Sequence, residues 1–464
     1  MGCDENPFHH GGSLDLTVAG REYIRRMPAK QEPVRYEEQR RYPIAAAEAW
    51  RLLADTDHLN RSIGLPAVQF SPLDGGDLTR RARARAYGVV PVRWREFPFD
   101  WIRERRYAVR REFETGPIEW LVGGIELQPV DGETNVVSYA YFKPKNVTGR
   151  FLWKLGRAPV HGLLEFCDLY LARKAAGEPD PVPLPRHRPQ VDGERLEQLV
   201  SELRRAPVDA SLVSNLRTRV LEGSDDQLVN VRAYAVADAW SADREAVLHL
   251  FLHATRAGLF AATWQLMCPN CRVPKAAVDD LGELPPQFHC DTCGILYTVD
   301  VDRDLELRFS ISSDVRSTRD EIYCIGGPLR MPHVAAQQHL RPREDRAVEL
   351  PVTEPLRLRT IGAANQLTLT PAAPSRVKDV KLTYAAGRWT GPHSLAAGGT
   401  VAVPAGATLT LRNQTEGFVL ALLESLDRTR DAASLADVRE LHGFDDLFDP
   451  EAIARASGRL SRYG

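Results

Sequence analysis

The sequence has few lysines and no long hydrophobic run. Lysine supplies only eight of the 60 basic residues, and such an excess of arginine is typical of a GC-rich genome rather than of phosphate binding. No stretch of eighteen uninterrupted apolar residues occurs, which excludes a membrane-spanning helix of the usual length. The net charge of −2 gives no overall attraction to nucleic acid or to anionic lipid.

The motifs of several enzyme classes are also absent. The chain contains no GxxxxGK[ST] phosphate-binding loop, no GxGxxG segment that opens a helix after a strand, and no GxSxG turn around a nucleophilic serine. Twelve histidines are present, but none stands in a recognisable Ser-His-Asp motif. With 464 residues, the chain has room for about two to four domains.

Four cysteines form two CxxC pairs, CPNC and CDTC, separated by eighteen residues. They are Cys268, Cys271, Cys290 and Cys293. Each CxxC turn places two thiolates within reach of one Zn²⁺, and four thiolates leave no position for a catalytic water. The spacing therefore predicts one structural zinc ion per chain, held in a ribbon.

The remaining cysteines bear on the redox compartment. Cys3, Cys167 and Cys324 bring the total to seven, and this odd number disfavours the competing interpretation of two disulfides in the CxxC region. The first thirty or so residues contain no apolar segment of the kind found in a secretory signal peptide. We therefore expect a reducing, cytoplasmic location.

The pattern from Val34 to Ala175 predicts a strand, a helix, an antiparallel meander and a long helix, in that order. Residues 34–42 alternate as a strand does, and residues 45–59 have helical spacing. Alternation returns in five runs, 79–87, 92–97, 101–113, 120–129 and 135–143. Residues 151–175 form a long amphipathic pattern. This order is typical of a helix-grip fold, in which a bent sheet wraps round one helix.

A sheet wrapped round a helix leaves a space that can hold an apolar ligand. We expect eight residues to border that space: Phe97, Phe99, Trp101, Trp120, Tyr139, Tyr141, Leu163 and Phe166. Ordinary core packing is the alternative for each of them, because half of the side chains of a meander point inward in any case.

Arginines recur in the same strands. They are Arg80, Arg81, Arg83, Arg85, Arg93, Arg95, Arg103, Arg105, Arg106, Arg110 and Arg111. A solvated outer face that alternates with the core explains Arg81, Arg83 and Arg85 without any partner. We prefer this interpretation to an anion-binding or membrane-surface patch.

The rest of the chain contains a linker, four helical patterns, the ribbon and a region of alternating runs with dense turn residues, which is typical of a β-sandwich. Five prolines favour an extended linker. The prediction is an α+β multidomain chain: a polar N-terminal arm (1–33), a START-like helix-grip domain (34–175), a Pro-rich linker (176–194), a small helical bundle (195–262), a zinc ribbon (263–311), a β-sandwich (312–426), and a C-terminal coupling helix and tail (427–464).

Residues 431–448 carry an apolar stripe. It consists of Leu435, Val438, Leu441, Leu447 and Phe448. A lone helix cannot bury such a stripe, so it needs a second surface. Two occupants stay open: a partner protein, to which the helix would transmit a signal, or the sandwich of the same chain.

Three segments are similar to one known arrangement. They are YPIAAAEAWRLLADTDHLNRSIGLPAVQF (42–70), LMCPNC to YCIGGPLRMPHVAAQQHL (266–340), and RDAASLADVRELHGFDDLFDPE (430–451). The first resembles the entry to the START-like domain at the front of certain bacterial class III adenylate/guanylate cyclases. The second resembles the uncharacterised zinc-ribbon and β-sandwich region of those proteins, and the third resembles the segment that leads into their catalytic domain. The resemblance covers about residues 34–451.

This resemblance implies the regulatory half of such a protein. Cyclase chemistry in that family requires two metal-binding aspartates on a downstream sheet, and the thirteen residues after Glu451 leave no room for them. We therefore expect a non-catalytic regulatory or sensor protein of cyclic-nucleotide-type signalling. Its expected partners are a hydrophobic small molecule or lipid and, through the C-terminal helix, a separately encoded nucleotide cyclase or another effector.

Two other function classes stay open. The first is an enzyme or carrier that acts on a hydrophobic small molecule in the helix-grip cavity. The second is a zinc-ribbon protein that binds nucleic acid, although no basic recognition helix stands out and Asp279, Asp280 and Glu283 place negative charge between the two CxxC pairs. We expect no nucleic-acid partner and no transmembrane segment.

Overall fold

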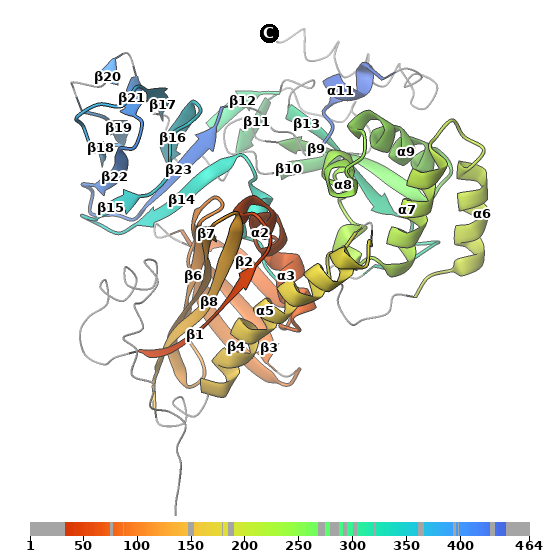
Figure 1. Ribbon diagram of the computed structural model, residues 1–464, viewed down its shortest axis with the longest axis horizontal. Coiled ribbons are helices and arrows are strands. Elements are labelled where there is room, and N and C mark those ends of the chain that lie inside the picture. The colour runs from red at the N-terminus through yellow and green to blue at the C-terminus, as the bar shows by residue number, and fades with distance from the viewer. Residues whose placement is uncertain are drawn as a thin grey trace, which may run out of the picture.

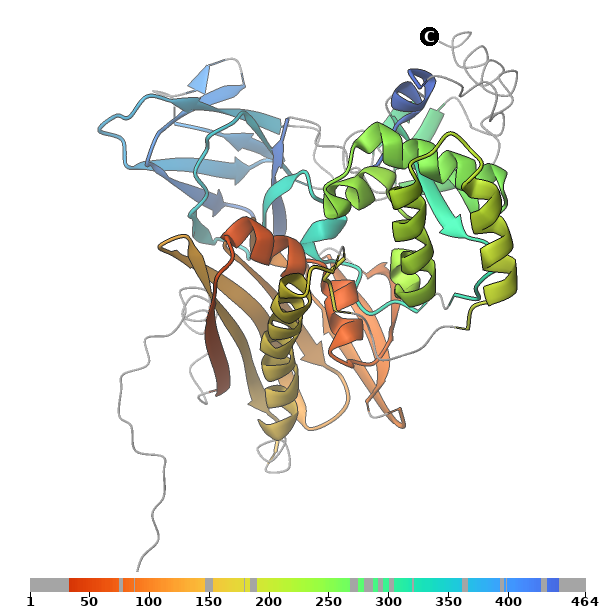
Figure 2. The same ribbon diagram turned by 45° about the vertical axis from the view of Figure 1, so that its right-hand side comes forward.

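The computed structural model describes residues 33–441 except for 75–77, 87, 147–152, 179, 184–189, 268–273, 279–286, 291–294, 300–303, 319–320, 361–365, 393–395, 398 and 427–431. At some positions inside these ranges only the backbone is described. None of the described helices is long and apolar enough to cross a membrane. The described residues form three bodies: a sheet wrapped round a helix, a mainly helical unit beside it, and an all-β unit above (Figures 1 and 2).

The first body is an antiparallel sheet that wraps round one long helix. Helix α5 (Trp153–Ala175) packs against β1 (Val34–Tyr42) and β8 (Glu133–Pro144), along one face of the sheet (Figure 2). The other elements are α2 (Ala46–Leu53), α3 (Thr56–Ser62), β2 (Val68–Asp74), β3 (Thr79–Ala86), β4 (Val90–Glu96), β5 (Asp100–Ile102), β6 (Arg106–Phe113) and β7 (Ile118–Val130). This arrangement confirms the predicted helix-grip fold.

The single helix predicted over residues 45–59 is divided into two. Helix α2 ends at Leu53 and α3 begins at Thr56, because Asp55 caps the second helix: its carboxylate accepts a hydrogen bond from the backbone N–H of His58 at 3.3 Å. An N-cap residue has non-helical backbone angles, so the cap interrupts a pattern that periodicity alone reads as continuous.

The second body combines four helices with a three-stranded sheet. The helices are α6 (Gly193–Leu203), α7 (Ala210–Glu222), α8 (Ala233–Trp240) and α9 (Arg244–Arg256); the sheet has the order β10 (Pro274–Val278), β9 (Phe260–Met267), β13 (Leu305–Ile311). Phe251 of α9 packs against Phe260 and Phe309 of the sheet, with ring centroids 5.2 and 5.0 Å away. The four helices predicted as a separate bundle thus share one hydrophobic core with strands of the predicted ribbon. Strands β11 (Gln287–Cys290) and β12 (Ile295–Thr298) form a hairpin beside them.

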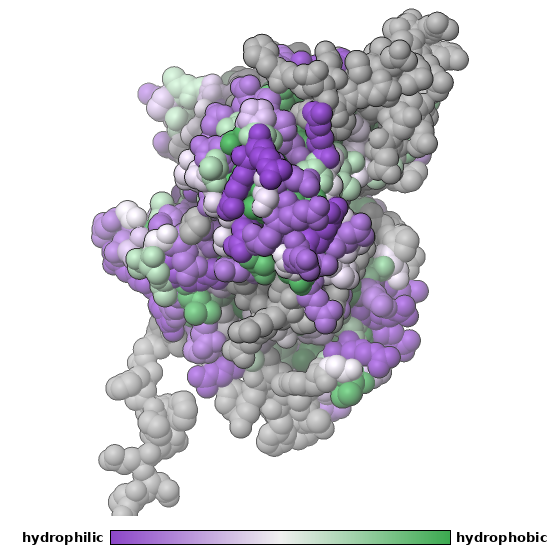
Figure 3. All heavy atoms as spheres, turned by 90° about the vertical axis from the view of Figure 1, so that its right-hand side faces the viewer, coloured by the Kyte–Doolittle hydropathy of each residue, from purple (hydrophilic) through white to green (hydrophobic). Residues whose placement is uncertain are grey.

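The surface of the second body is mainly polar on the face shown in Figure 3, where hydrophilic side chains predominate among the coloured residues and hydrophobic ones occupy small patches. This agrees with the amphipathic pattern of α6, whose Leu196, Leu199, Val200 and Leu203 are buried.

The third body consists of two sheets that enclose one core. One sheet has the order β14 (Val334–Leu340), β23 (Val419–Ser425), β16 (Leu356–Thr360), β17 (Gln366–Ala372), β21 (Thr400–Pro404), β20 (Ala396–Ala397). The other has the order β15 (Asp345–Val348), β22 (Thr408–Asn413), β18 (Asp379–Ala385), β19 (Arg388–Thr390). Leu358 and Leu369 of the first sheet share a buried cluster with Val380, Trp389 and Leu411 of the second. Alternating strands therefore pack face to face as in a sandwich.

One strand pairing joins the first and third bodies. Strand β5 pairs with β6 on one side and with β14 on the other, so fourteen strands belong to one sheet. The buried side chain of Gln337 donates to the carbonyl oxygen of Phe99 at 2.7 Å, and that of Gln338 donates to the carbonyl oxygen of Trp101 at 2.9 Å. Buried amides that satisfy backbone carbonyls in this way hold the two bodies in one register.

A buried ionic cluster lies one strand beyond this junction. Glu424 of β23 is fully buried and accepts hydrogen bonds from Arg359 Nη2 at 2.6 Å and from Arg357 Nε at 2.9 Å. Burial alone would raise the pKa of Glu424, but His333 and the two arginines outweigh it and lower the pKa. The carboxylate therefore stays ionised, as a buried charge does when it is paired and hydrogen-bonded.

The short helix α11 (Leu435–Arg439) returns to the second body (Figure 1). Leu435, Val438 and Leu441 join the core of α6–α9, β9 and β13, and Leu307 N–H donates to the carbonyl oxygen of Ala433 at 2.8 Å. The three described residues of the apolar stripe are thus buried within the chain, against the second body and not against the sandwich. Leu447 and Phe448 lie outside the described residues.

Truncation of a side chain in this stripe should destabilise the second body. We expect Leu435→Ala to lower the free energy of unfolding by about 2–5 kcal/mol, because it removes fully buried methyl groups and leaves a cavity. Leu426→Ala is the matched control, since Leu426 is 46 % exposed, and should change it by about 0.5 kcal/mol or less. Urea unfolding of both variants measures the difference; equal values would show that α11 is not part of the core.

Candidate functional site

Four of the eight predicted cavity residues come together between the sheet and α5. Phe99 and Trp101 share one buried cluster with Leu163 and Phe166 of the helix. All four are at most 6 % exposed. The cluster also contains Tyr107, whose ring centroid lies 6.0 Å from that of Phe99. These residues form the interior of the helix-grip body.

Three others lie on the opposite face of the sheet. Trp120, Tyr139 and Tyr141 form a separate buried cluster. Side chains alternate along a strand, so Tyr139 and Tyr141 of β8 point away from the face on which Val136 meets the α5 cluster. Tyr141 instead donates to Glu37 of β1 at 2.7 Å.

Phe97, the eighth predicted residue, is half-buried beyond the end of β4. Its ring packs against His339 of β14 at 5.9 Å and under Arg110 at 5.3 Å. It therefore lies where the first and third bodies meet.

A row of charged side chains crosses the interior face of the sheet. Arg80 of β3 is the cross-strand partner of Glu96 of β4, which in turn is paired with Arg111 of β6. Glu96 is only 6 % exposed and accepts hydrogen bonds from Arg111 Nε at 2.8 Å and from Trp94 Nε1 at 3.3 Å. Burial alone would lower the pKa of Arg111, but the charge of Glu96 raises it on balance.

Arg80 is the member of this row for which burial outweighs the attraction of Glu96. Burial lowers the pKa of Arg80, and Glu96 opposes that shift only in part. Within the described part of the chain, its guanidinium makes no hydrogen bond or ion pair. Arg80 is grouped with the other arginines in the prediction from sequence, but strand parity distinguishes it. Arg80 has the phase of buried Ala82, whereas exposed Arg81 has the phase of Arg83 and Arg85.

Cys324, from the segment that precedes β14, reaches the same interior. Its thiol accepts a hydrogen bond from Thr56 Oγ1 at 3.1 Å, and the backbone N–H groups of Tyr323 and Cys324 donate to Asp57 Oδ1 at 2.7 Å. Burial raises the pKa of Cys324 to about 11, with Glu96 adding to the shift. At neutral pH this cysteine is therefore a thiol and not a nucleophilic thiolate.

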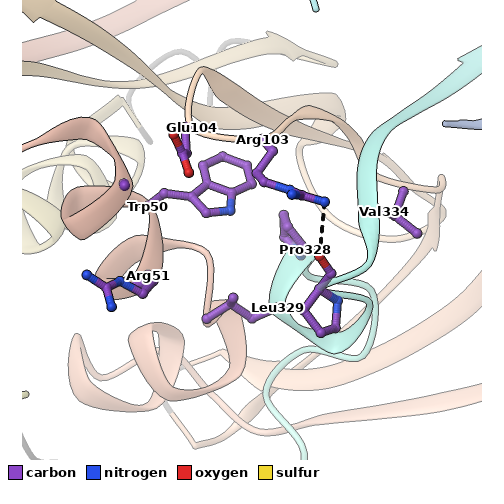
Figure 4. Close-up of a pocket in the computed structure, with 9 residues that line it drawn as sticks. Trp50, Arg51, Arg103, Glu104, Pro328, Leu329 and Val334 are labelled. Atoms are coloured by element: carbon purple, nitrogen blue, oxygen red, sulfur yellow. Dashed lines mark hydrogen bonds between the residues drawn. The ribbon is translucent and has the colours of Figure 1, made fainter. Parts of the chain in front are cut away.

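A pocket opens nearby, at the boundary between the first and third bodies. It has a volume of about 180 Å³ and is lined by Ala47, Trp50, Arg51, Arg103, Glu104, Pro328, Leu329, Pro332 and Val334. Figure 4 shows Trp50 forming one wall and Leu329 and Pro328 facing it, with Arg103 donating to the carbonyl oxygen of Pro332 at 3.2 Å. The volume is below the range of pockets that hold drug-sized ligands. None of the eight residues predicted to border the ligand space lines this pocket.

A buried histidine ties the first body to the second. His58 Nδ1 lies 2.8 Å from Asp226 Oδ2, and His58 Nε2 lies 2.8 Å from the carbonyl oxygen of Pro183. Only a doubly protonated imidazole donates from both nitrogens. Burial alone would lower the pKa of His58, but the hydrogen bond and charge of Asp226 raise it to about 9. The contact is thus an ion pair at neutral pH.

The predicted zinc ligands cannot be placed. Cys268, Cys271 and Cys293 lie outside the described residues, and of Cys290, which ends β11, only the backbone is described. Among the described residues no group of three or more potential ligands is gathered. The zinc ion stays a prediction from the cysteine spacing.

Two family models match the chain. Residues 33–174 match the family "Polyketide cyclase / dehydrase and lipid transport". These residues form a START-like helix-grip domain. Residues 194–321 match a family of unknown function, DUF5939, so the second body and the region of the CxxC pairs carry no assigned activity. No curated protein matches the chain.

Solved structures resemble the helix-grip part. Ara h 8.0201 is 17 % identical over 29 % of this chain and 97 % of its own (TM-score 0.23). The Zhui aromatase/cyclase from Streptomyces sp. R1128 is 14 % identical over 30 % of this chain and 96 % of its own (TM-score 0.24). The di-domain ARO/CYC BexL from the BE-7585A biosynthetic pathway is 18 % identical over 36 % of this chain and 56 % of its own (TM-score 0.24). At these values the likenesses carry no argument about function.

The His58 ion pair predicts a pH-dependent stability. A histidine titrates near 6.5 in the unfolded chain and at about 9 in the folded protein. Its contribution, roughly 3 kcal/mol, is therefore fully present below about pH 6.5 and is lost as the pH rises through about 9. Urea unfolding of the wild type should show this loss, and His58→Gln should remove it. His161→Gln, at a half-exposed histidine, should keep it; an unchanged pH dependence in His58→Gln would contradict the assignment.

Proposed function

We propose that this protein is a ligand-responsive regulatory protein whose helix-grip domain binds an amphipathic molecule with an anionic group. The observation that carries the proposal is the row of Arg80, Glu96 and Arg111 on the sheet face that packs against α5. Glu96 is bound to Arg111, which leaves the guanidinium of Arg80 available. In a poorly solvated interior such a cation attracts an anion strongly, and a carboxylate or phosphate matches the guanidinium fork.

The shared core supports a regulatory role. Cys324, Val334 and Leu422 from the C-terminal half pack in the same cluster as Leu163 and Phe166 of α5. A ligand among these side chains would contact both bodies and would favour one arrangement of them over another, which is what a coupling between sites requires.

The downstream partner in this proposal is a separately encoded nucleotide cyclase or another effector. The chain would reach it through the segment 427–464, whose helix α11 is anchored in the second body. A structural zinc ion at Cys268, Cys271, Cys290 and Cys293 would stabilise the ribbon next to that anchor. A cytoplasmic location is part of the same proposal.

Ligand binding is testable with a fluorescent fatty acid such as parinaric acid. The wild type should bind it, and Arg80→Gln should weaken binding by about tenfold or more, the loss expected for a charge-assisted hydrogen bond. Arg81→Gln is the matched control, because the neighbouring side chain is 65 % exposed on the outer face.

The methyl ester of the same probe separates charge recognition from apolar packing. It should bind the wild type and Arg80→Gln equally. Equal binding of the free acid to wild type, Arg80→Gln and Arg81→Gln would contradict the role of Arg80, and absence of binding to the wild type would contradict the ligand-binding function.

The buried carboxylate favours a second candidate, an enzyme that acts on a hydrophobic small molecule. Glu96 faces the interior beside Arg111 and Trp94, where a carboxylate could transfer a proton to or from a bound substrate. Turnover that is lost in Glu96→Gln while probe binding is retained would favour this candidate over a sensor.

The zinc ion makes a separate prediction. We expect one Zn²⁺ per chain as the difference between native and denatured masses. Cys290→Ser should lose the ion and increase hydrogen exchange in β11 and β12, because a Cys₄ site contributes directly to folding. Cys3→Ser is the control. A metal-free protein in which this hairpin is fully protected from hydrogen exchange would contradict the prediction.

A further inference from the structure

We propose that the outer face of the β3–β4 hairpin docks on an anionic lipid bilayer. This surface, here called the arginine face, consists of Arg81, Arg83, Arg85, Arg93 and Arg95. The first four are exposed, and Arg95 is 41 % exposed at its side chain. All five alternate with inward residues such as Ala82 and Trp94, so they share one side of the sheet.

In the arginine face, two pairs of like charges lie directly opposite each other across the strands, although the fold does not need charge at these positions. Arg81 is the cross-strand partner of Arg95, and Arg83 is the partner of Arg93. Like charges directly opposite one another destabilise a strand pair. A hairpin that keeps two such pairs gives up stability that an uncharged partner would restore, which points to a use for the positive charge.

The carboxylates nearby neutralise only part of this charge. Glu114 lies 3.7 Å from Arg81, and Glu112 lies 3.8 Å from Arg95 but 2.6 Å from Arg110. Arg83 donates to Gln69, a neutral residue, at 2.7 Å. The guanidinium groups of Arg85 and Arg93 contact no carboxylate among the described residues. Arg83, Arg85 and Arg93 therefore give this face positive charge that no carboxylate among the described residues neutralises.

The turn that ends the hairpin adds exposed apolar groups. Val89 is 71 % exposed and Val90 is 52 % exposed, next to Gly88, whose φ of +74° forms the tight turn. Two β-branched side chains at a turn in water gain nothing from folding. Val90 has the phase of Trp94 and points to the opposite side of the sheet from the arginines, whereas Val89 lies in the turn itself. Placed at the boundary of headgroups and acyl chains, Val89 would be removed from water while the arginines meet the phosphates.

This pairing of charge with an exposed valine distinguishes a bilayer from a nucleic acid. A nucleic acid would use the arginines but offers no apolar layer to Val89. Each arginine near an anionic surface increases binding by about fivefold. The proposal is independent of Arg80, which points to the other side of the same strand.

Vesicle co-sedimentation of the full chain tests this docking. Wild type should bind phosphatidylcholine vesicles that contain phosphatidylglycerol, less strongly as salt increases, and should not bind pure phosphatidylcholine. The triple variant Arg83→Gln, Arg85→Gln, Arg93→Gln should bind roughly 100-fold more weakly, and the valine variant Val89→Ser roughly threefold more weakly. The triple variant should also unfold at a temperature no lower than the wild type, since it removes the Arg83–Arg93 repulsion.

The control variant Arg204→Gln, Arg205→Gln, Arg376→Gln removes the same charge from exposed arginines elsewhere and should bind as the wild type does. An equal loss of vesicle binding in this control variant would show that net charge alone accounts for binding, and would overturn the proposal. So would unchanged binding of the valine variant together with displacement of the vesicles by duplex DNA, which would identify a nucleic-acid surface. The triple variant should still bind parinaric acid. The test of bilayer docking is therefore separate from the test of ligand binding.

Discussion

The pairing of β5 with β14 is the constraint on which the rest of the structure depends. A three-residue strand at the rim of the helix-grip sheet would otherwise leave unsatisfied backbone groups and expose Trp101 and Ile102. Strand β14 satisfies them, and Gln337 and Gln338 bind the neighbouring carbonyls. The helix-grip sheet and one of the two sheets of the sandwich are thereby one hydrogen-bonded sheet, so neither body is positioned independently of the other.

The local parts of this fold could be predicted from sequence. Alternation and helical spacing predicted most of the strands in order and the long helix α5, because both patterns reflect burial of one face. They missed β2, and the single run predicted over residues 101–113 is divided into β5 and β6. Asp209 and Asp243 accept the capping hydrogen bonds that begin α7 and α9, and such start signals are local in the sequence. The match of residues 33–174 to a family model agrees with that prediction.

The non-local parts could not be predicted. Trp101 contacts Val334 across 233 residues of chain, and no periodicity encodes which two strand edges meet. The presence of aromatic residues in a strand does not show which face of the sheet each one occupies. The prediction therefore places Tyr139 and Tyr141 beside Phe166, although they belong to separate clusters on opposite faces. Strand parity places Arg80 on the interior face, but Arg80 stands in a run of arginines that a solvated outer face explains, so it received no separate role.

The shared core also affects how this chain can be divided in evolution. A helix-grip unit is transferable when its interior is built from its own residues. Here Cys324, Val334 and Leu422 complete the interior, although they follow the long helix α5 by well over a hundred residues. The boundary near residue 175 is therefore a boundary in the amino-acid sequence and not in the folded molecule. Recombination there would separate a sheet from part of its own core, so the three bodies are expected to be inherited together.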